Sequence, residues 1–253
     1  MSEPKPNIIG VTILLALALA VIVGANEWKT SLQVHRVDVR GNRLVEQNEV
    51  LQLAQVADGT PLYLADISAI QRNVMSHHYV KDVTVERDLP NTIRVTVRER
   101  LPIALVCRAE TVYLDDEGVI LPRTIAKGLF DLPVISGVPG ALSMPLGSRL
   151  EASDITEALG ILAAAKLLSS ELSHNISEIR LHEGGDLVLY TAEGGIPVIF
   201  GRGDTARKLV RFEGFWNSVV RTRGPQHLQY VDLRFDDQVV ARWDTQQLTA
   251  ANS

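Results

Sequence analysis

The sequence has few of the residues that tie small domains together covalently. Cys107 is the one cysteine among 253 residues, which excludes a disulfide within the chain. Because an unpaired cysteine usually packs as a small hydrophobic residue, we expect Cys107 in a hydrophobic core. Aromatic residues make up only 5% of the chain, but hydrophobic residues make up 46%, which is enough for cores without disulfides. One large or two small domains are therefore expected.

Positive charge is not in excess either. The chain carries 25 Lys and Arg residues against 30 Asp and Glu residues, so its net charge is −5 at pH 7. Binding to DNA or RNA requires clustered Lys and Arg residues that neutralise phosphates, and no basic stripe runs along the chain. Nucleic acid is therefore excluded as a general partner.

Recognisable catalytic motifs are also missing. The sequence has no Gly-x-Ser-x-Gly, no cysteine with a plausible histidine partner, and no carboxylate pair framed by a catalytic motif. These absences favour a protein that binds rather than catalyses. We expect no catalytic residue and no cofactor.

Three short motifs carry a weak chemical signal. The His77-His78 pair lacks further ligands at metal-binding spacing, so a helix end is favoured over a metal site. Residues 115–117, Asp-Asp-Glu, lack the later Glu of a calcium loop, and a solvated turn is favoured. Residues 201–204, Gly-Arg-Gly-Asp, lack the remaining residues of a phosphate loop, and a strand end followed by a helix start is favoured.

Residues 8–25 form a long hydrophobic run, IIGVTILLALALAVIVGA, in which Thr12 is the one polar side chain. At about 1.5 Å per residue a helix of this length spans about 27 Å, close to the hydrocarbon thickness of roughly 30 Å. Trp28 and Lys29 would then lie at the membrane interface. A cleaved signal peptide is the alternative, because residues 23–25 resemble a cleavage site, but the run exceeds the roughly 7 to 15 residues of a signal core.

The next seventy residues alternate between strand and helix patterns. Hydrophobic residues recur at every second position in the predicted strands and at positions three to four apart in the predicted helices. Asp66 is placed to cap the second helix, and residues 88–91, Asp-Leu-Pro-Asn, predict a turn between the last two strands. The predicted segments, in β-α-α-β-β order, are 34–43, 45–56, 66–77, 83–86 and 93–98.

The second half of the chain predicts further strands and two longer helices. Asp154 and Glu157 have the spacing of a capping box at the start of one helix, and Asp204 is placed to cap the other. Glycine pairs mark hairpin turns between the strands. The predicted strands are 176–181, 186–191 and 197–201, followed by a final pair within 230–243. In the last strand Phe235, Asp237, Val239 and Ala241 are predicted to share one side.

Several of these stretches resemble the FtsQ/DivIB family of bacterial cell division proteins. The residues that carry the resemblance are VDVRGNRLVEQNEV at 37–50, YVKDVTVERDLPNTIRVTVRERLPIAL at 79–105, LPVISG at 132–137 and YVDLRFDDQVVARW at 230–243. Glu99-Arg100-x-Pro102-x-Ala104 is a further part of the pattern. The stretch that precedes it resembles a polypeptide-transport-associated (POTRA) domain.

The resemblance implies an α+β fold: one N-terminal transmembrane helix, a β-α-α-β-β POTRA domain, then a β-rich domain with flanking helices. The implied parts are a cytoplasmic head at 1–7, a transmembrane helix at 8–28, the POTRA domain at 32–101, the FtsQ-type β domain at 102–243 and a flexible tail at 244–253. It also implies a single-pass protein of the bacterial inner membrane, enriched at the septum, with a cytoplasmic N-terminus and its bulk in the periplasm. Local charge does not favour this orientation, since Lys29, Arg36 and Arg40 follow the helix.

The resemblance further implies a non-enzymatic scaffold that recruits the division proteins FtsB and FtsL. In the family the C-terminal strands capture FtsB by strand addition, and FtsB arrives with FtsL. The implied contact residues are Arg234, Phe235, Asp237, Val239, Ala241 and Trp243, with Phe235 and Trp243 as aromatic anchors. Ordinary packing in a terminal hairpin is the alternative for each of them.

A second contact is implied at an edge of the POTRA domain. Val83, Val85 and Arg87 would receive an earlier-arriving division protein there, and structural packing alone is the alternative. Two other functions remain open for the whole chain. One is a POTRA-containing translocation or chaperone module, although the chain is too short to add a membrane barrel. The other is a membrane-anchored periplasmic cell-wall enzyme.

Overall fold

The computed structural model describes residues 8–107, 110–123, 130–138, 144–182 and 185–244. The chain forms two compact units, Met1–Glu99 and Arg100–Ser253, and the predicted α+β class with an apolar N-terminal helix is confirmed. The expected head at 1–7 and residues 245–253 of the expected tail lie outside the described residues.

The N-terminal helix α1 runs from Ile8 to Ser31. It continues past the hydrophobic run because no glycine pair or proline interrupts residues 26–31. Residues Ile9–Lys29 are long and apolar enough to cross a membrane, and no other helix in the described ranges is. Its apolar side chains are exposed rather than packed against protein, with Leu14 70% exposed and Val21 68% exposed. A helix of this length, composition and exposure is typical of a single-pass membrane anchor.

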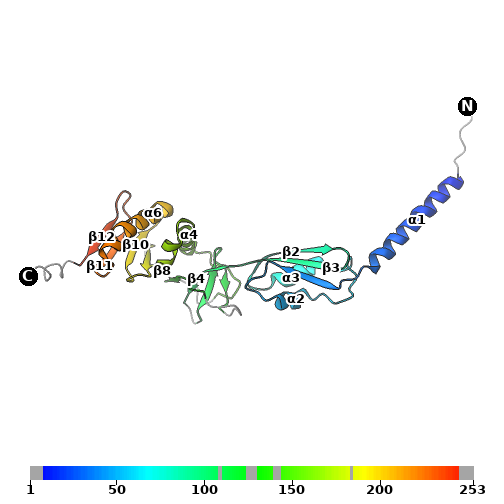
Figure 1. Cartoon of the computed structure of the whole chain (residues 1–253), viewed down its shortest axis with the longest axis horizontal. Helices are drawn as coiled ribbons and strands as arrows, with labels where there is room; N and C mark the ends of the chain where they lie inside the picture. Colours follow the sequence, from blue (N-terminus) through cyan, green and yellow to red (C-terminus); the bar gives the residue numbers. More distant parts are fainter. Residues whose placement is uncertain (1–7, 108–109, 124–129, 139–143, 183–184, 245–253) are drawn as a thin grey trace, which may run out of the picture. The chain divides into compact units, whose positions relative to one another are not determined.

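The rest of the first unit has the predicted β-α-α-β-β order (Figure 1). Strand β3 lies in the centre of a three-stranded sheet, parallel to β1 and antiparallel to β2. The two helices follow one another between β1 and β2, and α3 packs against β2. The elements are β1 (Arg36–Arg40), α2 (Gln47–Ala54), α3 (Ile67–Met75), β2 (Val80–Asp88) and β3 (Thr92–Glu99).

One face of this sheet carries the hydrophobic core. Val95 and Val97 of β3 are buried, and so are Ile70 and Val74 of α3. Asp66 caps α3 as predicted, because its carboxylate accepts a hydrogen bond from the Ala69 N–H at 2.9 Å. The core therefore forms where the apolar sides of the strands and helices face each other.

The opposite face of the sheet is charged, and its charges are paired across strands. Arg94 lies 2.5 Å from Asp88 and 3.5 Å from Asp38, and Arg98 lies 3.7 Å from Asp82. These pairs join β1, β3 and β2 on the solvent side. Both arginines on this face are therefore held by carboxylates of neighbouring strands.

The second unit is built on a nine-stranded sheet. Its strand order is β12-β11-β10-β9-β8-β7-β4-β5-β6, so strands from both ends of the unit lie at its two edges. The strands are β4 (Pro102–Val106), β5 (Val112–Asp115), β6 (Ile120–Leu121), β7 (Val134–Ser136), β8 (Ile176–Leu181), β9 (Leu187–Thr191), β10 (Pro197–Gly201), β11 (Leu228–Asp232) and β12 (Val240–Trp243).

Helices pack on this sheet and bury its hydrophobic side. Figure 1 shows α4 (Ser153–Leu168) and α6 (Thr205–Phe215) beside β8 and β10, and the two helices contact each other. Ile179 and Val198 of the sheet are fully buried in the same core as Phe212 of α6. The remaining helical segments are α5 (Ser170–His174), the π-helical turn η1 (Trp216–Val220) and α7 (Arg221–Arg223).

The predictions for Asp154, Glu157 and Cys107 in the second unit are wrong. Asp154 and Glu157 do not form a capping box: both carboxylates bind the Arg202 guanidinium at 2.7 Å, and the N-cap residue of α4 is Ala152. Cys107 is exposed rather than buried. It follows the last residue of β4, Val106, whose side chain takes the inward position, so the alternation of the strand directs Cys107 outward.

Asp204 occupies the N-cap position of α6, but its side chain makes no capping hydrogen bond. The start of α6 is held instead by Lys208, which is buried. Its Nζ donates to the carbonyl oxygens of Phe200 at 2.9 Å and Arg202 at 2.6 Å. The strand end and helix start predicted for residues 201–204 are therefore observed, with a lysine as the residue that joins them.

Glu99 is the last residue of β3 and fixes the connection that follows β1. Its carboxylate accepts hydrogen bonds from three successive backbone N–H groups, those of Arg43, Leu44 and Val45, at 2.8 to 3.1 Å. A carboxylate with three backbone donors is a strong, charge-assisted arrangement. Glu99 thereby replaces the partners that these amides would otherwise need from a strand or from water.

Arg100, the next residue, also holds a connection between strands through its charge, in this case the turn from β5 to β6 in the second unit. Its guanidinium lies 2.6 Å from the Asp115 carboxylate and 2.9 Å from that of Glu117. The Asp115 side chain is fully buried and also accepts hydrogen bonds from the Glu117 and Val119 N–H groups at 2.9 and 2.8 Å. The predicted solvated turn is therefore wrong for Asp115, because Arg100 supplies the charge that lets the carboxylate be buried.

Replacing Asp115 by Asn tests this buried pair. The substitution leaves Arg100 without its buried counter-charge, so we expect the free energy of unfolding to fall by about 3 kcal/mol. Urea unfolding of the full chain followed by circular dichroism measures the change. Asp131→Asn, at an exposed carboxylate of the same unit, is the matched control and should shift the midpoint little. Equal effects of the two substitutions would contradict the assigned role of Asp115.

Candidate partner-binding edge

Strand β12 lies at one edge of the nine-stranded sheet. It pairs with β11 in antiparallel register, and no other strand in the described part of the chain pairs with it. The Asp244 N–H donates to the His227 carbonyl oxygen at 2.8 Å, so the backbone of Asp244 faces β11. Backbone groups alternate in direction along a strand, which places those of Val240 and Arg242 toward β11 as well. The N–H and C=O groups of Ala241 and Trp243 therefore face outward.

The side chains of this edge are arranged differently from its backbone. Val239, Ala241 and Trp243 are partly buried and pack against the core of the second unit. The Trp243 ring also lies 5.6 Å from the guanidinium carbon of Arg223. Arg242, on the other side of the strand, is exposed. Ala241 and Trp243 therefore have backbone groups that face outward and side chains that pack against the protein.

The last strand is shorter than the sequence predicts. β12 begins at Val240, so Phe235 and Asp237 lie in the connection from β11 and do not share a strand side with Ala241. The Arg211 guanidinium donates to the carbonyl oxygens of Phe235 and Asp236, both at 2.6 Å. A helix residue therefore holds this backbone in a bend, which the alternating residue pattern did not reveal.

Phe235 is the large aromatic side chain of this connection, and it is 46% exposed. Its backbone is fixed by Arg211 while its ring remains accessible. Asp237, two residues along, is also exposed. The connection therefore presents an aromatic ring and a carboxylate close in sequence to the start of β12.

Arg234 is held by two carboxylates. Its guanidinium hydrogen-bonds to Asp232 at 2.8 to 3.3 Å and to Asp186 at 3.1 Å. Asp232 is buried at the end of β11, and burial alone would raise the pKa of its carboxyl. The hydrogen bonds and charge of Arg234 outweigh this, so the pKa of Asp232 lies below its ordinary value and that of Arg234 is raised.

Gly201 makes room for the Arg234 side chain. A Cβ at Gly201 would lie 2.8 Å from Cγ of Arg234, and its φ of +69° also favours glycine. Sequence reasoning selected Arg234 as a partner contact and missed Asp232, Asp186, Arg211 and Gly201. Asp186, Arg211 and Gly201 are each separated from the connection by more than twenty residues, so no local pattern could associate them with it.

The second candidate edge, β2, is occupied in part by side chains of its own unit. The Gln71 side chain donates to the Val83 carbonyl oxygen at 2.9 Å, and the Val83 N–H donates to Asp82 at 3.0 Å. The Val83 side chain is buried, and that of Val85 is half-buried. A partner strand at this edge would first have to displace Gln71 and Asp82.

Arg87 of the same edge is bound to the turn between α2 and α3. Its Nε donates to the Leu62 carbonyl oxygen at 2.9 Å, and its Nη2 donates to that of Ala65 at 2.8 Å. The guanidinium therefore braces the fold of the first unit. This contact accounts for Arg87 without a partner protein.

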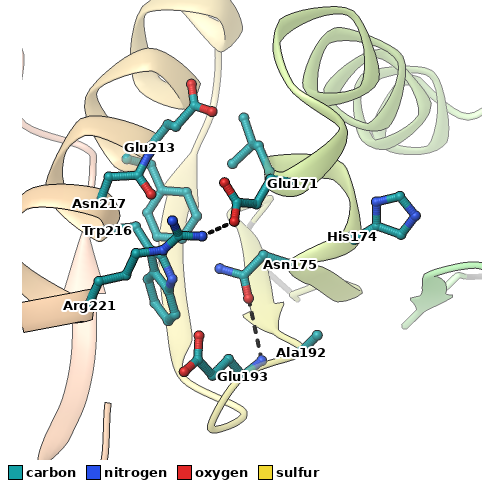
Figure 2. A pocket seen from close by; sticks show the side chains of 11 residues that line it. Glu171, His174, Asn175, Ala192, Glu193, Glu213, Trp216, Asn217 and Arg221 are labelled. Carbon is teal, nitrogen blue, oxygen red and sulfur yellow. Dashed lines mark hydrogen bonds and ion pairs between the residues drawn. The ribbon is translucent and has the colours of Figure 1, made fainter. Parts of the chain in front are cut away.

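The second unit also contains a pocket of about 230 Å³ between α5, the β9–β10 turn, α6 and η1 (Figure 2). Phe212 and Trp216 line it, with ring centroids 5.6 Å apart and ring planes tilted by 53°. Figure 2 shows Arg221 reaching across it to Glu171, and the two form an ion pair. The full lining is Glu171, Leu172, His174, Asn175, Ala192, Glu193, Phe212, Glu213, Trp216, Asn217 and Arg221.

Two charged residues that line this pocket, Arg221 and Glu171, pair with each other. The described residues that line it include three glutamates and one arginine, but no serine, threonine or cysteine that could act as a nucleophile. His174 Nδ1 lies 2.5 Å from the Ser170 carbonyl oxygen of its own helix. Across the residues that the structure describes, no group of three or more His, Cys, Asp or Glu side chains is arranged to hold a metal ion.

Two family models match the chain. The model described as "POTRA domain, FtsQ-type" matches residues 32–100, and the model described as "Cell division protein FtsQ/DivIB, C-terminal" matches residues 104–234. The second match ends at Arg234, at the beginning of the connection to β12. Together the two matches cover most of both units and leave out α1 and β12.

Several curated proteins named "Cell division protein FtsQ" are similar to the chain. The one from Rhodothermus marinus is 33% identical over 223 residues, which cover 85% of this chain and 79% of that protein. The one from Myxococcus fulvus is 30% identical over 244 residues, covering 94% and 82%. The one from Geotalea daltonii is 27% identical over 215 residues, covering 84% and 76%.

Replacing Arg234 by Met tests the ion pair beneath the connection to β12. Because the pKa of Asp232 is lowered in the folded state, this pair stabilises the fold above the ordinary pKa of 3.8, and the stabilisation is lost as the pH falls through the folded-state value. We therefore expect Arg234→Met to be less stable than the unmodified chain at pH 7. The difference should narrow below pH 3.8.

Urea unfolding at a series of pH values measures this difference. Arg242→Met, at an exposed arginine of β12, is the control and should show no such pH dependence. If the difference in free energy of unfolding between Arg234→Met and the unmodified chain stays constant from neutral to acidic pH, the coupling to Asp232 is contradicted.

Proposed function

Because the chain belongs to the FtsQ/DivIB family of bacterial cell division proteins, we propose that it is a non-enzymatic scaffold that recruits FtsB and FtsL. FtsB adds a strand to the outer side of β12, and FtsL arrives with it. The scaffold links early and late division proteins at the septum. The observation that carries this proposal is the outward-facing edge of β12 in the described structure.

The geometry of β12 suits strand addition. The outward N–H and C=O groups of Ala241 and Trp243 supply main-chain hydrogen bonds, which give affinity in this mode of recognition. Their side chains pack against the core, so the strand is already ordered before a partner arrives. A pre-ordered edge reduces the entropy lost on binding.

The connection before β12 supplies side chains for selectivity. Phe235 is an exposed aromatic ring on a backbone that Arg211 fixes, which are the properties of an interface anchor. Asp237 adds a carboxylate at the rim. Arg234 contributes by holding the connection, since Asp232 and Asp186 already neutralise its guanidinium. Trp243 contributes through both its backbone and its packing.

The membrane helix contributes by confinement. α1 anchors the chain in the inner membrane with a cytoplasmic N-terminus, and the two units lie in the periplasm. Partners that are anchored in the same membrane meet β12 at a raised effective concentration without any new contact. Membrane confinement therefore adds to the modest affinity of a short added strand.

The POTRA edge is a second, weaker site for an earlier-arriving division protein. β2 lies at the edge of its sheet, which favours a contact through Val83, Val85 and Arg87. Gln71 and Asp82 occupy the backbone groups of Val83, so this contact requires a local rearrangement that β12 does not. Family membership favours both contacts over a translocation module or a cell-wall enzyme.

Replacing Ala241 by Pro removes one outward N–H from β12. Because this N–H takes no part in the β11–β12 ladder, proline should leave the fold intact while it removes a hydrogen bond to the partner strand. We expect capture of FtsB by the full chain in detergent to weaken by about tenfold, from the lost bond and the bulk of the ring. Biolayer interferometry measures the affinity.

Ala241→Ser is the matched control, since it keeps the N–H and should bind normally. Thermal unfolding should show that both variants keep the stability of the unmodified chain. Normal binding by a stably folded Ala241→Pro variant would exclude strand addition at this position.

Replacing Phe235 by Ala tests the aromatic anchor separately from the backbone. An exposed anchor of this kind typically contributes more than about 1 kcal/mol, so capture of FtsB should weaken by about fivefold or more. Val210→Ala on α6 removes an apolar side chain that is 53% exposed and serves as the control. If both variants bind FtsB equally well, Phe235 lies outside the interface.

A further inference from the structure

Two large side chains of the first unit are exposed in a turn between α2 and α3. Leu64 is 72% exposed and Tyr63 is 38% exposed, whereas the neighbouring Leu62 is fully buried. The turn is closed by the Leu64 and Ala65 N–H groups, which donate to the Pro61 carbonyl oxygen at 2.9 and 3.1 Å. Its two apolar side chains therefore face outward from a well-defined backbone.

Backbone hydrogen bonds attach this turn to the segment that follows α1. The Leu62 N–H donates to the Leu32 carbonyl oxygen at 2.7 Å, and Gln33 forms a bridge with Pro61. Since α1 ends at Ser31, the turn is bonded to the next two residues of the chain. From its other side it is braced by Arg87, which donates to Leu62 and Ala65. The turn is thus fixed beside the end of α1.

This position lies within reach of a membrane surface. The apolar part of α1 ends at Lys29, and Leu32 is three residues further along, at most about 10 Å away. The interfacial layer on each side of the hydrocarbon is about 5 to 7 Å thick. The Lys29 Nζ lies 5.9 Å from the centre of the Tyr63 ring, so the turn reaches the last residue of the apolar span.

We propose that the turn at residues 62–65 enters the interfacial layer of the lipid bilayer that α1 crosses. Tyr63 takes the position that amphipathic rings favour at the interface, and Leu64 buries its side chain at the boundary between the lipid headgroups and the acyl chains. Trp28, which is 56% exposed at the end of α1, lies in the same layer. The first unit is then held to lipid at two points, and its freedom to swivel about the end of α1 is restricted.

This inference rests on the proposed membrane anchoring by α1, and fluorescence quenching can test the two separately. Single cysteines are introduced into a Cys107→Ser background of the full chain at Leu64, Met75 and Leu14, and each is labelled with an environment-sensitive dye. Met75 is 42% exposed and lies at the far end of α3, and Leu14 lies within the apolar span. The labelled chains are placed in vesicles of phosphatidylethanolamine and phosphatidylglycerol.

Nitroxides near the lipid headgroups should quench the label at position 64 about twofold more strongly than the label at position 75. Nitroxides on the acyl chains should quench the label at position 14. Circular dichroism and thermal unfolding verify that each labelled chain is folded, which is expected because these positions are exposed.

Equal quenching at positions 64 and 75, with strong quenching at position 14, overturns the inference while the membrane anchor stands. Absence of quenching at position 14 overturns the anchor and the inference together. If the label at position 64 is quenched by nitroxides no more than the label at position 75, and its emission shifts only when a division protein is added, the turn binds protein instead of lipid, which also overturns the inference.

Discussion

A β-sheet edge leaves a row of backbone donors and acceptors unsatisfied, and partner binding by strand addition depends on where that row lies. In the described second unit β12 is such an edge, with the N–H and C=O groups of Ala241 and Trp243 turned outward. Natural proteins usually protect an edge from other strands. β2 in the first unit shows such protection, because Gln71 and Asp82 bond to Val83. The contrast between a covered edge and an open one explains why we place partner capture at β12.

A strand at an open edge binds a partner strand best when its own backbone is already held in place. In this protein charged side chains hold much of that backbone. Asp232 and Arg234 fix the connection into β12, while Lys208 joins β10 to α6 in the centre of the same unit. Glu99 and Arg100 act in the same way within their own units, Glu99 on three backbone amides and Arg100 on the buried Asp115. Of these groups, Asp232, Lys208 and Asp115 are buried, and each makes hydrogen bonds to an arginine or to backbone groups, the condition under which a buried charge is tolerated.

Regular patterns in the sequence predicted the fold where each element could be read locally. The β-α-α-β-β order, the cap at Asp66 and the membrane-length helix all follow from spacing within a few residues. Predictions were wrong where a distant residue decides the outcome. Asp115 is buried because of Arg100, Asp154 and Glu157 bind Arg202 instead of capping a helix, and Arg211 bends the backbone at Phe235. No local pattern carries information about such partners. The terminal strand pair was therefore predicted from the sequence, but the contacts that fix the residues before its last strand were not.

Amide hydrogen exchange in the complex tests the central claim most directly. Residue-resolved exchange of β12 should be measured for the full chain alone and with FtsB bound. Strand addition predicts that the amides of Ala241 and Trp243 become strongly protected on binding, while those of Val240 and Arg242, already bonded to β11, change little. Uniform protection of the four amides, or none at Ala241 and Trp243, would contradict the claim that a partner strand pairs with this edge.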